Sequence, residues 1–418
     1  MSLVVFEDRS CARLWPVSLA RPAFEISCGA SRLLDRLRAI DIRFTAIVRP
    51  HLRDVVAADH PWLSVTDQFN PSAIKGQPSV LFVNARLVPS IGAAKWLKEL
   101  RQKNESGIWR QGETIVAALC EGDRLAAAGE GVIEDQLARA NLSDQRADMP
   151  LLEYAHDIVR YHLLILRDNL AEKLAGGGYR EIADGVFAKP GVELGPLVAT
   201  DSGPGPIVLE DEVVVEPFAF LKGPIHIDHH TRVRTHAFLC GNLAIGHTVK
   251  IGGDLQASIF EPYSNKQHEG FLGHSYVGSW VNLGAGTSNS DLKNTYGLIN
   301  ARYLNEKVAT GMQFCGTMFG DYSRTAIHTA IFTGLSVGLG SFLYGHVTAA
   351  VPSFVNYART LGQVGGVPCE VLEKVQARMF ARRGLVQRGC DAKLLQAIYE
   401  MTADERRGLS SGSLPPVF

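Results

Sequence analysis

Residues 207–255 read IVLEDEVVVEPFAFLKGPIHIDHHTRVRTHAFLCGNLAIGHTVKIGGDL, and an aliphatic residue recurs in them every six positions. A second set of mostly small or branched residues follows the first by four positions. The first set comprises Leu209, Val215, Leu221, Ile227, Val233, Leu239, Ile245 and Ile251, and the second Val213, Ala219, Ile225, Thr231, Ala237, Leu243, Val249 and Leu255. A six-residue period suits neither an isolated helix nor a hairpin sheet, whereas hexapeptide repeats are typical of β-helical solenoids. The pattern therefore predicts a parallel β-helix whose interior is filled by the first set.

The same period extends beyond this stretch in both directions. It includes Ile182, Ala188 and Leu194 before the stretch, and Phe319, Thr325, Ile331, Val337 and Leu343 after it. Residues 200–206, TDSGPGP, shift the phase by three positions and predict a loop. We therefore expect a β-helix domain over residues 180–350. A β-sandwich is the alternative fold, but its strands and turns vary in length.

The first 150 residues have a different pattern. Short apolar runs predict strands at residues 3–7, 44–48, 80–84 and 114–120, and an amphipathic helix is expected at 31–40. Strands that alternate with helices are typical of an α/β layer with a largely parallel sheet. Residues 1–150 are therefore predicted to form an α/β domain.

Two further segments are predicted to be helical. Residues 151–179 end in three glycines and are expected to form a linker helix. A C-terminal helical segment is expected at 366–408. Within it, residues 370–384 place Leu372, Val375 and Met379 on one stripe, with Gly384 as the stop. Such a helix can cover the end or the side of a β-helix, whose open end exposes unpaired backbone groups.

The composition limits the classes of function. The 42 basic and 43 acidic side chains nearly cancel, so no net charge favours binding to nucleic acid or to an anionic membrane. The start of the chain lacks the pattern of a secretion signal, and no apolar run is long enough to span a membrane. Seven cysteines without a C-x-x-C spacing favour a reducing compartment, which predicts a cytoplasmic protein.

Residues 272–287, LGHSYVGSWVNLGAGT, resemble the acetyltransferase part of the bacterial N-acetylglucosamine-1-phosphate uridyltransferase/glucosamine-1-phosphate acetyltransferase family. Residues 263–276 (YSNKQHEGFLGHSY) and 320–334 (GDYSRTAIHTAIFTG) resemble a branch of sugar nucleotidyltransferases related to that family. The resemblance implies a nucleotidyltransferase-like α/β domain, a linker helix and a left-handed β-helix that forms a homotrimer. It also implies transfer of an acyl group from acetyl-CoA, or another acyl-CoA, to a sugar phosphate or a nucleotide sugar.

The resemblance also implies site residues. His268, four residues before the Leu-Gly pair, matches the catalytic base of the family, whereas Phe271 stands where the family has a tyrosine. Substrate contacts are implied for Asn265, Lys266, Asn282 and Asn289, and contacts with the acyl-CoA for Gly284 and Ala285. For Lys266, the sequence leaves open an ordinary solvated lysine instead of a partner for a phosphate.

A histidine suits the implied reaction, because a neutral imidazole near pH 7 can take the proton of the acceptor as it attacks the thioester. His268 lies in a polar insertion between repeats, so the core does not need its side chain. An ordinary surface histidine is the alternative interpretation. His274 and His328 are further candidates, although both occupy polar repeat positions that we expect to face solvent or another subunit.

No metal site is expected in the repeats. His229, His230 and His236 are close in sequence, but outward-facing repeat positions explain them better than a shared metal does.

The N-terminal domain departs from the nucleotidyltransferase pattern. Residues 9–24, RSCARLWPVSLARPAF, correspond to the glycine-rich loop, but Arg9 and Cys11 replace its glycines. Arg13 matches and remains a candidate for nucleotide binding, whereas Ala85 stands where the family has its metal-binding aspartate. Glycines let backbone amides approach phosphates closely, so their loss removes the expected cradle. Mg²⁺ is expected only if this domain is active.

These observations predict an acyl-CoA-dependent acyltransferase that acts on a sugar phosphate or a nucleotide sugar. Two alternatives remain open. One is a sugar-1-phosphate nucleotidyltransferase that uses the N-terminal domain, and the other is a β-helix that binds a ligand or acts as a scaffold without catalysis.

Overall fold

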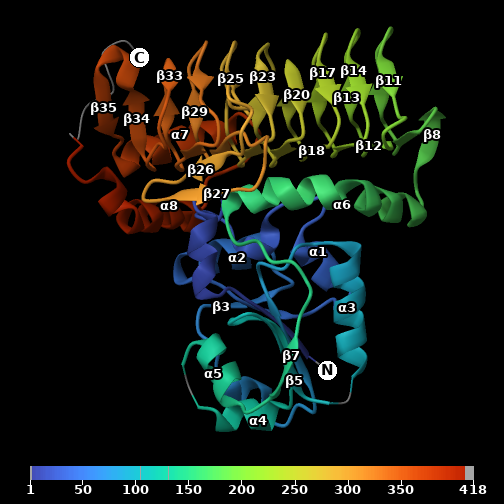
Figure 1. Cartoon of the computed structure of the whole chain (residues 1–418), viewed down its shortest axis with the longest axis vertical. Helices are drawn as coiled ribbons and strands as arrows, with labels where there is room; N and C mark the ends of the chain where they lie inside the picture. Colours follow the sequence, from blue (N-terminus) through green and yellow to red (C-terminus); the bar gives the residue numbers. More distant parts are fainter. Residues whose placement is uncertain (1, 104, 130, 410–418) are drawn as a thin grey trace. The chain divides into compact units, whose positions relative to one another are not determined.

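The computed structural model describes residues 2–103, 105–129 and 131–409. The chain forms two compact units (Figure 1). The first unit combines residues 1–14, 20–26 and 31–153. The second combines residues 15–19, 27–30 and 154–418. Each unit is described by itself below.

The first unit is built on a seven-stranded sheet with the strand order β3-β2-β1-β4-β6-β5-β7. Its strands are β1 (Ser2–Phe6), β2 (Thr45–Ile47), β3 (Ser64–Thr66), β4 (Val80–Asn84), β5 (Gly107–Gln111), β6 (Thr114–Cys120) and β7 (Ser143–Arg146). Its helices are α1 (Leu33–Arg38), α2 (Arg53–Asp59), α3 (Ile91–Gln102), α4 (Gly122–Ala127) and α5 (Ile133–Arg139). Strands β1 to β4 are parallel, whereas β6 runs antiparallel to both β4 and β5. Strand β7 pairs parallel with β5, so the expected α/β layer with a largely parallel sheet is confirmed and β6 is the antiparallel strand within it.

The second unit contains α6 (Ala155–Ala175) and a left-handed parallel β-helix whose strands form three faces. The first face contains β8 (Arg180–Ala183), β9 (Val186–Ala188), β12 (Ile207–Leu209), β15 (Ile225–Ile227), β18 (Leu243–Ile245), β21 (Ile259–Phe260), β24 (Tyr276–Val277), β28 (Met318–Phe319) and β31 (Ser336–Val337). The second contains β10 (Glu193–Leu194), β13 (Val214–Val215), β16 (Arg232–Val233), β19 (Lys250–Ile251) and β22 (Asn265–Lys266), then β29 (Arg324–Thr325), β32 (Phe342–Leu343), β34 (Val355–Ala358) and β35 (Gln363–Gly366). The third contains β11 (Ala199–Asp201), β14 (Phe220–Lys222), β17 (Phe238–Cys240), β20 (Asp254–Gln256) and β23 (Phe271–Gly273), then β25 (Ser288–Asn289), β30 (Ala330–Ile331) and β33 (His346–Val347).

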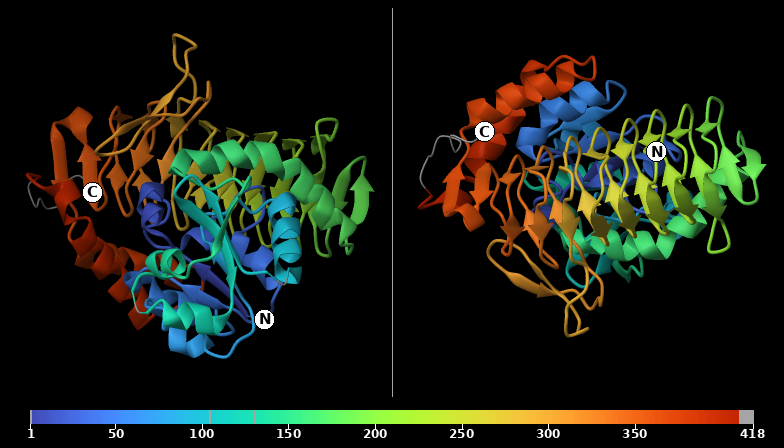
Figure 2. Two further views of the ribbon diagram at one scale, coloured as in Figure 1. Left: turned by 60° about the horizontal axis from the view of Figure 1, so that its bottom comes forward. Right: turned by 90° about the horizontal axis from the view of Figure 1, so that it is seen from above.

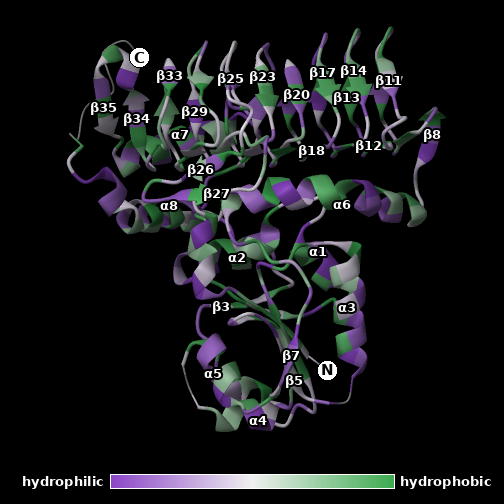
Figure 3. Cartoon of the chain, viewed as in Figure 1, coloured by the Kyte–Doolittle hydropathy of each residue, from purple (hydrophilic) through white to green (hydrophobic). Residues whose placement is uncertain are grey.

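The six-residue repeat forms the core of this β-helix. Both sets of repeat residues in 207–255 are buried, and the aliphatic ones belong to one hydrophobic cluster. Both hydrophobic and hydrophilic residues occur along the coils (Figure 3). Burying one such aliphatic side chain contributes about 1.5–3 kcal/mol, so the stacked interior is the main source of stability. The predicted loop at 200–206 is confirmed in part, because residues 200 and 201 belong to β11 (Ala199–Asp201) and a turn follows at 202–206.

The corners between faces carry the three histidines that suggested a metal. His230 pairs with Glu212, with 2.9 Å between the histidine Nδ1 and the carboxylate. His229 stacks on His247 of the next coil, and His236 stacks on Phe218. Among the described residues, no three His, Cys, Asp or Glu side chains are grouped closely enough to hold a metal ion. The rings instead connect successive coils at the surface.

Two sets of helices and one hairpin flank the β-helix. Helix α6 lies within the range expected for the linker helix, and Lys173 near its end pairs with Glu210 of the coils at 2.9 Å. The hairpin of β26 (Asn300–Arg302) and β27 (Lys307–Ala309) and the C-terminal helices α7 (Cys369–Ala381) and α8 (Gly389–Met401) lie on opposite sides of the coils (Figure 2). None of the helices in the described parts of the chain is both long and apolar enough to cross a bilayer.

Helix α7 packs along the side of the coils, as one of the two expected arrangements allowed. Its Phe380 ring lies 4.6 Å from the Trp280 ring, and Leu372 and Met379 of the predicted stripe are buried. Val375 is only half-buried. Gly384 has φ of +70°, the left-handed conformation that ends helices, as predicted.

The interior between residues 264 and 325 contains polar groups beside apolar side chains such as Leu272 and Phe319. Lys266 pairs in register with Ile251, so it takes an interior position that is aliphatic in the preceding coil. Its side chain is fully buried, and its Nζ donates to the carbonyl oxygens of His268 and Glu269, each at 3.0 Å. Burial lowers the pKa of Lys266 to about 8. Farther along, the hydroxyls of Thr287 and Thr325 form a buried hydrogen bond of 2.6 Å.

The buried lysine predicts a specific pH dependence of stability. Below pH 8, Lys266 is protonated in both the folded and the unfolded states, so the full cost of burying its charge is present. Between pH 8 and about 10.4, the folded state releases the proton first, and the free energy of unfolding rises with pH. Relative to Lys266→Met, we expect wild type to gain on the order of 3 kcal/mol between pH 7 and pH 10.5.

Urea unfolding of both proteins at a series of pH values measures this difference. Parallel pH profiles for the two proteins would contradict a neutralised, buried lysine.

Candidate functional site

The loop that carries His268 lies at the corner between the second and third faces. It connects β22, which ends at Lys266, to β23, which begins at Phe271. His268 is exposed, and its side chain lines neither of the two cavities of the second unit described below. The neighbouring Gln267 does line one of them. The imidazole therefore lies beside a cavity, on an open surface.

The backbone of this loop is fixed from two sides. Lys266 holds the carbonyls of residues 268 and 269 from the interior, and the amide of Gly286 donates to the Glu269 carbonyl at 3.1 Å. At Gly270, with φ of +118°, an added Cβ would come within 2.2 Å of the Thr287 carbonyl oxygen. The histidine loop is thus packed against the turn at 284–287. The fold therefore brings the residue expected as base next to the residues expected to contact an acyl-CoA.

The turn at 284–287 is itself held in the ladder of coils. The Gly284 amide donates to the Thr325 hydroxyl at 2.9 Å, and the Ala285 carbonyl accepts from the His328 amide at 2.7 Å. An added Cβ at Gly286 would come within 2.3 Å of the His328 imidazole. His328 therefore packs against this turn. The backbone groups of Gly284 and Ala285 that make these bonds are already used within the chain.

His274 differs from the expected solvent-facing histidine. Its Nδ1 lies 2.8 Å from a carboxylate oxygen of Asp291, and its ring stacks on Phe314 with 5.1 Å between centroids. Only 14% of its side chain is exposed. The pair connects the third face to the segment that carries the hairpin.

The Asn289 side chain joins two neighbouring coils by hydrogen bonds. Its Oδ1 accepts from the Gly273 amide at 3.0 Å, and its Nδ2 donates to the Gly273 carbonyl and the Ser275 hydroxyl, each at 3.1 Å. Both amide protons are thereby used. Asn289 lines a cavity, but its polar atoms are engaged by the chain. Lys266 is likewise turned into the interior, so this structure places its ammonium group away from any surface phosphate.

Asn265 and Asn282 belong to a column of polar residues on the second face, which we call the polar column. Strand register stacks Arg232, Lys250, Asn265, Asn282 and Arg324 on successive coils. Neighbouring strands are about 4.8 Å apart, so these side chains form one continuous line. Two of the predicted substrate residues therefore lie side by side, flanked by cations.

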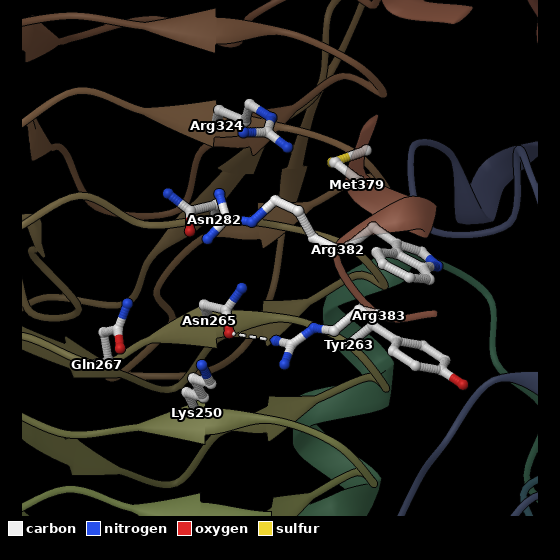
Figure 4. Close-up of a pocket in the computed structure, with 10 residues that line it drawn as sticks. Lys250, Tyr263, Asn265, Gln267, Asn282, Arg324, Met379, Arg382 and Arg383 are labelled. Carbon is white, nitrogen blue, oxygen red and sulfur yellow. Dashed lines mark hydrogen bonds between the residues drawn. The ribbon is translucent and has the colours of Figure 1, made fainter. Parts of the chain in front are cut away.

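The polar column and the end of α7 together form a cavity of about 110 Å³, the cationic cleft. It is lined by Lys250, Asn265, Asn282 and Arg324 of the column and by Arg382 and Arg383, which follow α7 (Figure 4). Arg383 donates to the Asn265 side-chain oxygen at 2.9 Å. Tyr263 and Trp280, stacked with 4.3 Å between their centroids, also line it.

The cations of this cleft lack counterions. Of the described residues that line it, none is a carboxylate, and Lys250, Arg324, Arg382 and Arg383 form no ion pair in the described part of the chain. The contrast within the polar column is direct, since Arg232 pairs with Glu216 at 3.2 Å. Burial, followed by the positive charge of Arg382, lowers the pKa values of Arg324 and Arg383. Burial and the neighbouring arginines also lower the pKa of Lys250.

A larger cavity of about 740 Å³ lies on the third face, below the segment that carries the hairpin. Its polar lining includes Asn289, Lys293, Arg302 and Lys307, and its apolar lining includes Ile299 and Phe332. We call it the hairpin cavity. It is separated from the cationic cleft by the corner of the β-helix where His268 lies.

The first unit contains a cavity of about 860 Å³ at the carboxyl ends of β1, β2 and β3, where α/β sheets commonly bind ligands. Glu7 follows β1 and forms a bidentate ion pair with Arg49, at 3.0 and 3.1 Å. Asp8 forms another with the fully buried Arg86, at 2.6 and 2.8 Å. Burial alone would raise the pKa of Asp8, but the hydrogen bonds and charge of Arg86 lower it below its usual value.

These ion pairs do not fit a site for Mg²⁺. A hard cation needs available carboxylate oxygens, and the two acids after β1 are each neutralised by an arginine. Ala85 is buried at the position expected for a metal-binding aspartate, and its amide donates to the Phe6 carbonyl. Arg13 is exposed, 3.7 Å from Glu153, and does not line this cavity.

Sequence reasoning missed Lys250, Arg324 and Arg383 as possible ligand contacts. Lys250 and Arg324 had a usable signal, because both precede an interior repeat residue by one position and so face outward. Arg383 had none, since only the packing of α7 brings it to the coils.

Comparison with known proteins gives one family match. Residues 3–173 match the family model described as sugar nucleotidyl transferase, which covers less than half of the chain. No curated protein matches the sequence.

Several solved structures are similar to the chain. The polySia-specific acetyltransferase NeuO is 15% identical, with coverage of 41% of this chain and 82% of that chain and a TM-score of 0.23. The UDP-N-acetylglucosamine acyltransferase from Campylobacter jejuni is 10% identical, with coverage of 56% and 100% and a TM-score of 0.27. The Francisella novicida UDP-N-acetylglucosamine acyltransferase is 13% identical, with coverage of 56% and 94% and a TM-score of 0.26. With TM-scores below 0.5, these matches decide neither activity nor substrate.

Proposed function

We propose that the chain is an acyl-CoA-dependent acyltransferase that acts on a sugar phosphate or a nucleotide sugar, with His268 as the general base. One observation carries the proposal. The loop of His268 is pinned by Lys266 and packed against the turn at 284–287, between the cationic cleft and the hairpin cavity. A backbone held this firmly fixes the point from which the imidazole extends, which reduces the reorganisation that the reaction requires.

In the proposed reaction, the neutral imidazole of His268 takes a proton from the amine or hydroxyl of the acceptor. The acceptor attacks the thioester carbonyl, the new bond to the acyl carbon forms, and the carbon–sulfur bond breaks. The CoA thiolate leaves and takes the proton that His268 accepted, which restores the neutral imidazole, so the products are the acylated sugar and free CoA. Asn265 and Asn282 are proposed to contact the sugar from the polar column.

Acetyl-CoA, or another acyl-CoA, is the proposed co-substrate. The hairpin cavity, with apolar and cationic side chains beside the turn at Gly284 and Ala285, is the proposed location of its chain. Its volume of about 740 Å³ falls in the usual range of ligand pockets.

A homotrimer is proposed to complete the site. His268 is exposed in the single chain, and catalytic groups normally act where water is excluded. Large apolar side chains on the second unit are also exposed, including Phe218 (51%), Phe238 (45%), Ile327 (68%) and Phe332 (52%). We propose a cytoplasmic location, because the seven cysteines are unpaired thiols, as expected in a reducing compartment.

The second candidate is a sugar-1-phosphate nucleotidyltransferase, favoured by the family match over residues 3–173. The ion pairs of Glu7 with Arg49 and of Asp8 with Arg86 oppose it, because they neutralise the two acids immediately before the expected phosphate loop. We therefore propose that the first unit retains the fold without nucleotidyl transfer.

For acyl transfer, we expect wild type to release CoA from acetyl-CoA with a member of a panel of amino sugars and their phosphates. His268→Ala should lower kcat roughly 10²–10⁴-fold, the usual contribution of a general base. His230→Ala removes an exposed histidine from another coil, so its kcat should stay within about twofold of wild type. A tenfold loss would require the activation free energy to rise by about 1.4 kcal/mol. A thiol-reactive dye measures the release. Binding without turnover in wild type would support the scaffold alternative, and equal kcat in wild type and His268→Ala would remove His268 from the mechanism.

For assembly, sedimentation equilibrium should give three times the chain mass of 45.5 kDa. Ile327→Asp should dissociate the trimer and abolish CoA release, since Ile327 precedes the His328 that packs at the proposed site. Ile42→Asp, at an equally exposed position in the first unit, is the control. A fully active monomer would refute this assembly.

For the first unit, pyrophosphate release from UTP and N-acetylglucosamine 1-phosphate with Mg²⁺ should stay at background. Release that disappears in a folded Asp8→Asn variant would instead support nucleotidyl transfer.

A further inference from the structure

The cationic cleft gathers four positive side chains without a counterion among the described residues. We propose that it is a binding site for a phosphate group, formed jointly by the polar column and the segment after α7. The site uses Lys250 and Arg324 of the coils together with Arg382 and Arg383.

The geometry supports a site built before a ligand arrives. Lys250 and Arg324 are fixed to coils three steps apart in the polar column, with the two asparagines between them. Arg383 is oriented by its hydrogen bond to Asn265, and α7 is anchored by the contact of Phe380 with Trp280. The Nε of Arg324 is buried and has no hydrogen-bond partner among the described residues. A buried donor without a partner destabilises the fold, so it is explained best by a ligand atom that accepts from it.

Electrostatics supports an anion in the same place. Like charges held close together repel one another, and none of the described residues that line the cleft is a carboxylate that could offset the repulsion. Elsewhere on the same face, Glu216 serves both Arg232 and Arg234, at 3.2 and 2.5 Å. In the described part of the chain, no such acid lies beside Arg324 and Arg382, which leaves a position of positive potential that a bound anion would neutralise.

The chemical class follows from the donors and the size. Guanidinium groups donate in a fork that matches phosphate oxygens, and the amides of Asn265 and Asn282 can serve further oxygens. A volume of about 110 Å³ is below that of a pocket for a whole ligand, so the cleft holds one charged group of a larger molecule. A phosphate with more than one negative charge matches four cations better than a carboxylate does.

Two molecules could supply this phosphate, namely the acceptor sugar phosphate or the CoA. Naming either source rests on the proposed function, whereas phosphate binding itself does not. Binding can therefore be measured without turnover, and a failure of acyl transfer would leave the site intact.

The first experiment is calorimetric titration of the full chain with inorganic pyrophosphate in the absence of Mg²⁺. Arg382→Gln and Arg324→Gln should each weaken binding at least about tenfold, and raising the salt concentration should weaken binding to wild type. Arg378→Gln is the matched control, because it removes the same charge from an exposed position on α7 outside the cleft. Equal affinities in Arg378→Gln and both cleft variants would overturn the proposal, because the probe would then bind elsewhere, for example in the first unit.

Thermal unfolding separates a ligand site from a structural role. Arg382 is exposed and adds to the repulsion in the cleft, so Arg382→Gln should fold and should have the same or a higher Tm without ligand. Loss of pyrophosphate binding together with an unchanged or raised Tm supports the site. A lowered Tm with unchanged binding would show that the arginine is structural and would overturn the proposal.

A second set of titrations identifies the source. Removing the 3′-phosphate from CoA should weaken binding to wild type but not to Arg382→Gln if the cleft holds that phosphate. Glucosamine 1-phosphate should instead lose affinity in Arg382→Gln if the cleft holds the acceptor. His268→Ala should bind all of these probes as wild type does. If neither ligand is affected by Arg382→Gln or Arg324→Gln, the proposal fails.

Discussion

The stacking of interior side chains from coil to coil is the constraint on which the second unit depends. Each coil can bury its apolar residues only against the coils before and after it, so strand register is fixed along the whole β-helix. A fixed register also orders the outside, because residues one position before the interior set must stand in a line. The polar column from Arg232 to Arg324 is therefore a consequence of core packing. The same packing fixes the corner where His268 lies between two cavities.

The β-helix could be predicted because its six-residue period continues without interruption over many repeats, as in Leu209, Val215 and Leu221. The role of Lys266 was not, for a physical reason. Ile251 and Lys266 are partners in register although they are fifteen residues apart, instead of the eighteen that separate Val233 from Ile251. This shortened coil hides the interior position of Lys266 from a search at fixed spacing. A lysine in the core is stable only where carbonyl groups converge on it, and the sequence does not display that convergence.

Other parts of the site depend on contacts between distant segments. Arg383 reaches Asn265 across 118 residues, and the packing of α7 on the coils, including Phe380 on Trp280, sets that approach. In the first unit, the sequence shows that Arg9 and Cys11 replace the glycines, which predicts a changed phosphate loop. The sequence does not show the ion pairs of Glu7 and Asp8, because their arginine partners come from the ends of other strands. Local pattern thus predicted the elements, and tertiary packing decided which charges meet.

The polar groups in the interior between residues 264 and 325 have a mechanical consequence. Cohesion between neighbouring coils comes mainly from apolar contact, and here ammonium, hydroxyl and amide groups replace some of the aliphatic side chains, whereas Leu272, Val277 and Phe319 keep the apolar cluster continuous. We therefore expect neighbouring coils to hold each other less strongly here than in the aliphatic coils at 207–255. Local opening of a solenoid begins where adjacent coils hold each other least, so these coils are expected to have the lowest local stability. The elements that would open around a ligand are those whose separation costs the least.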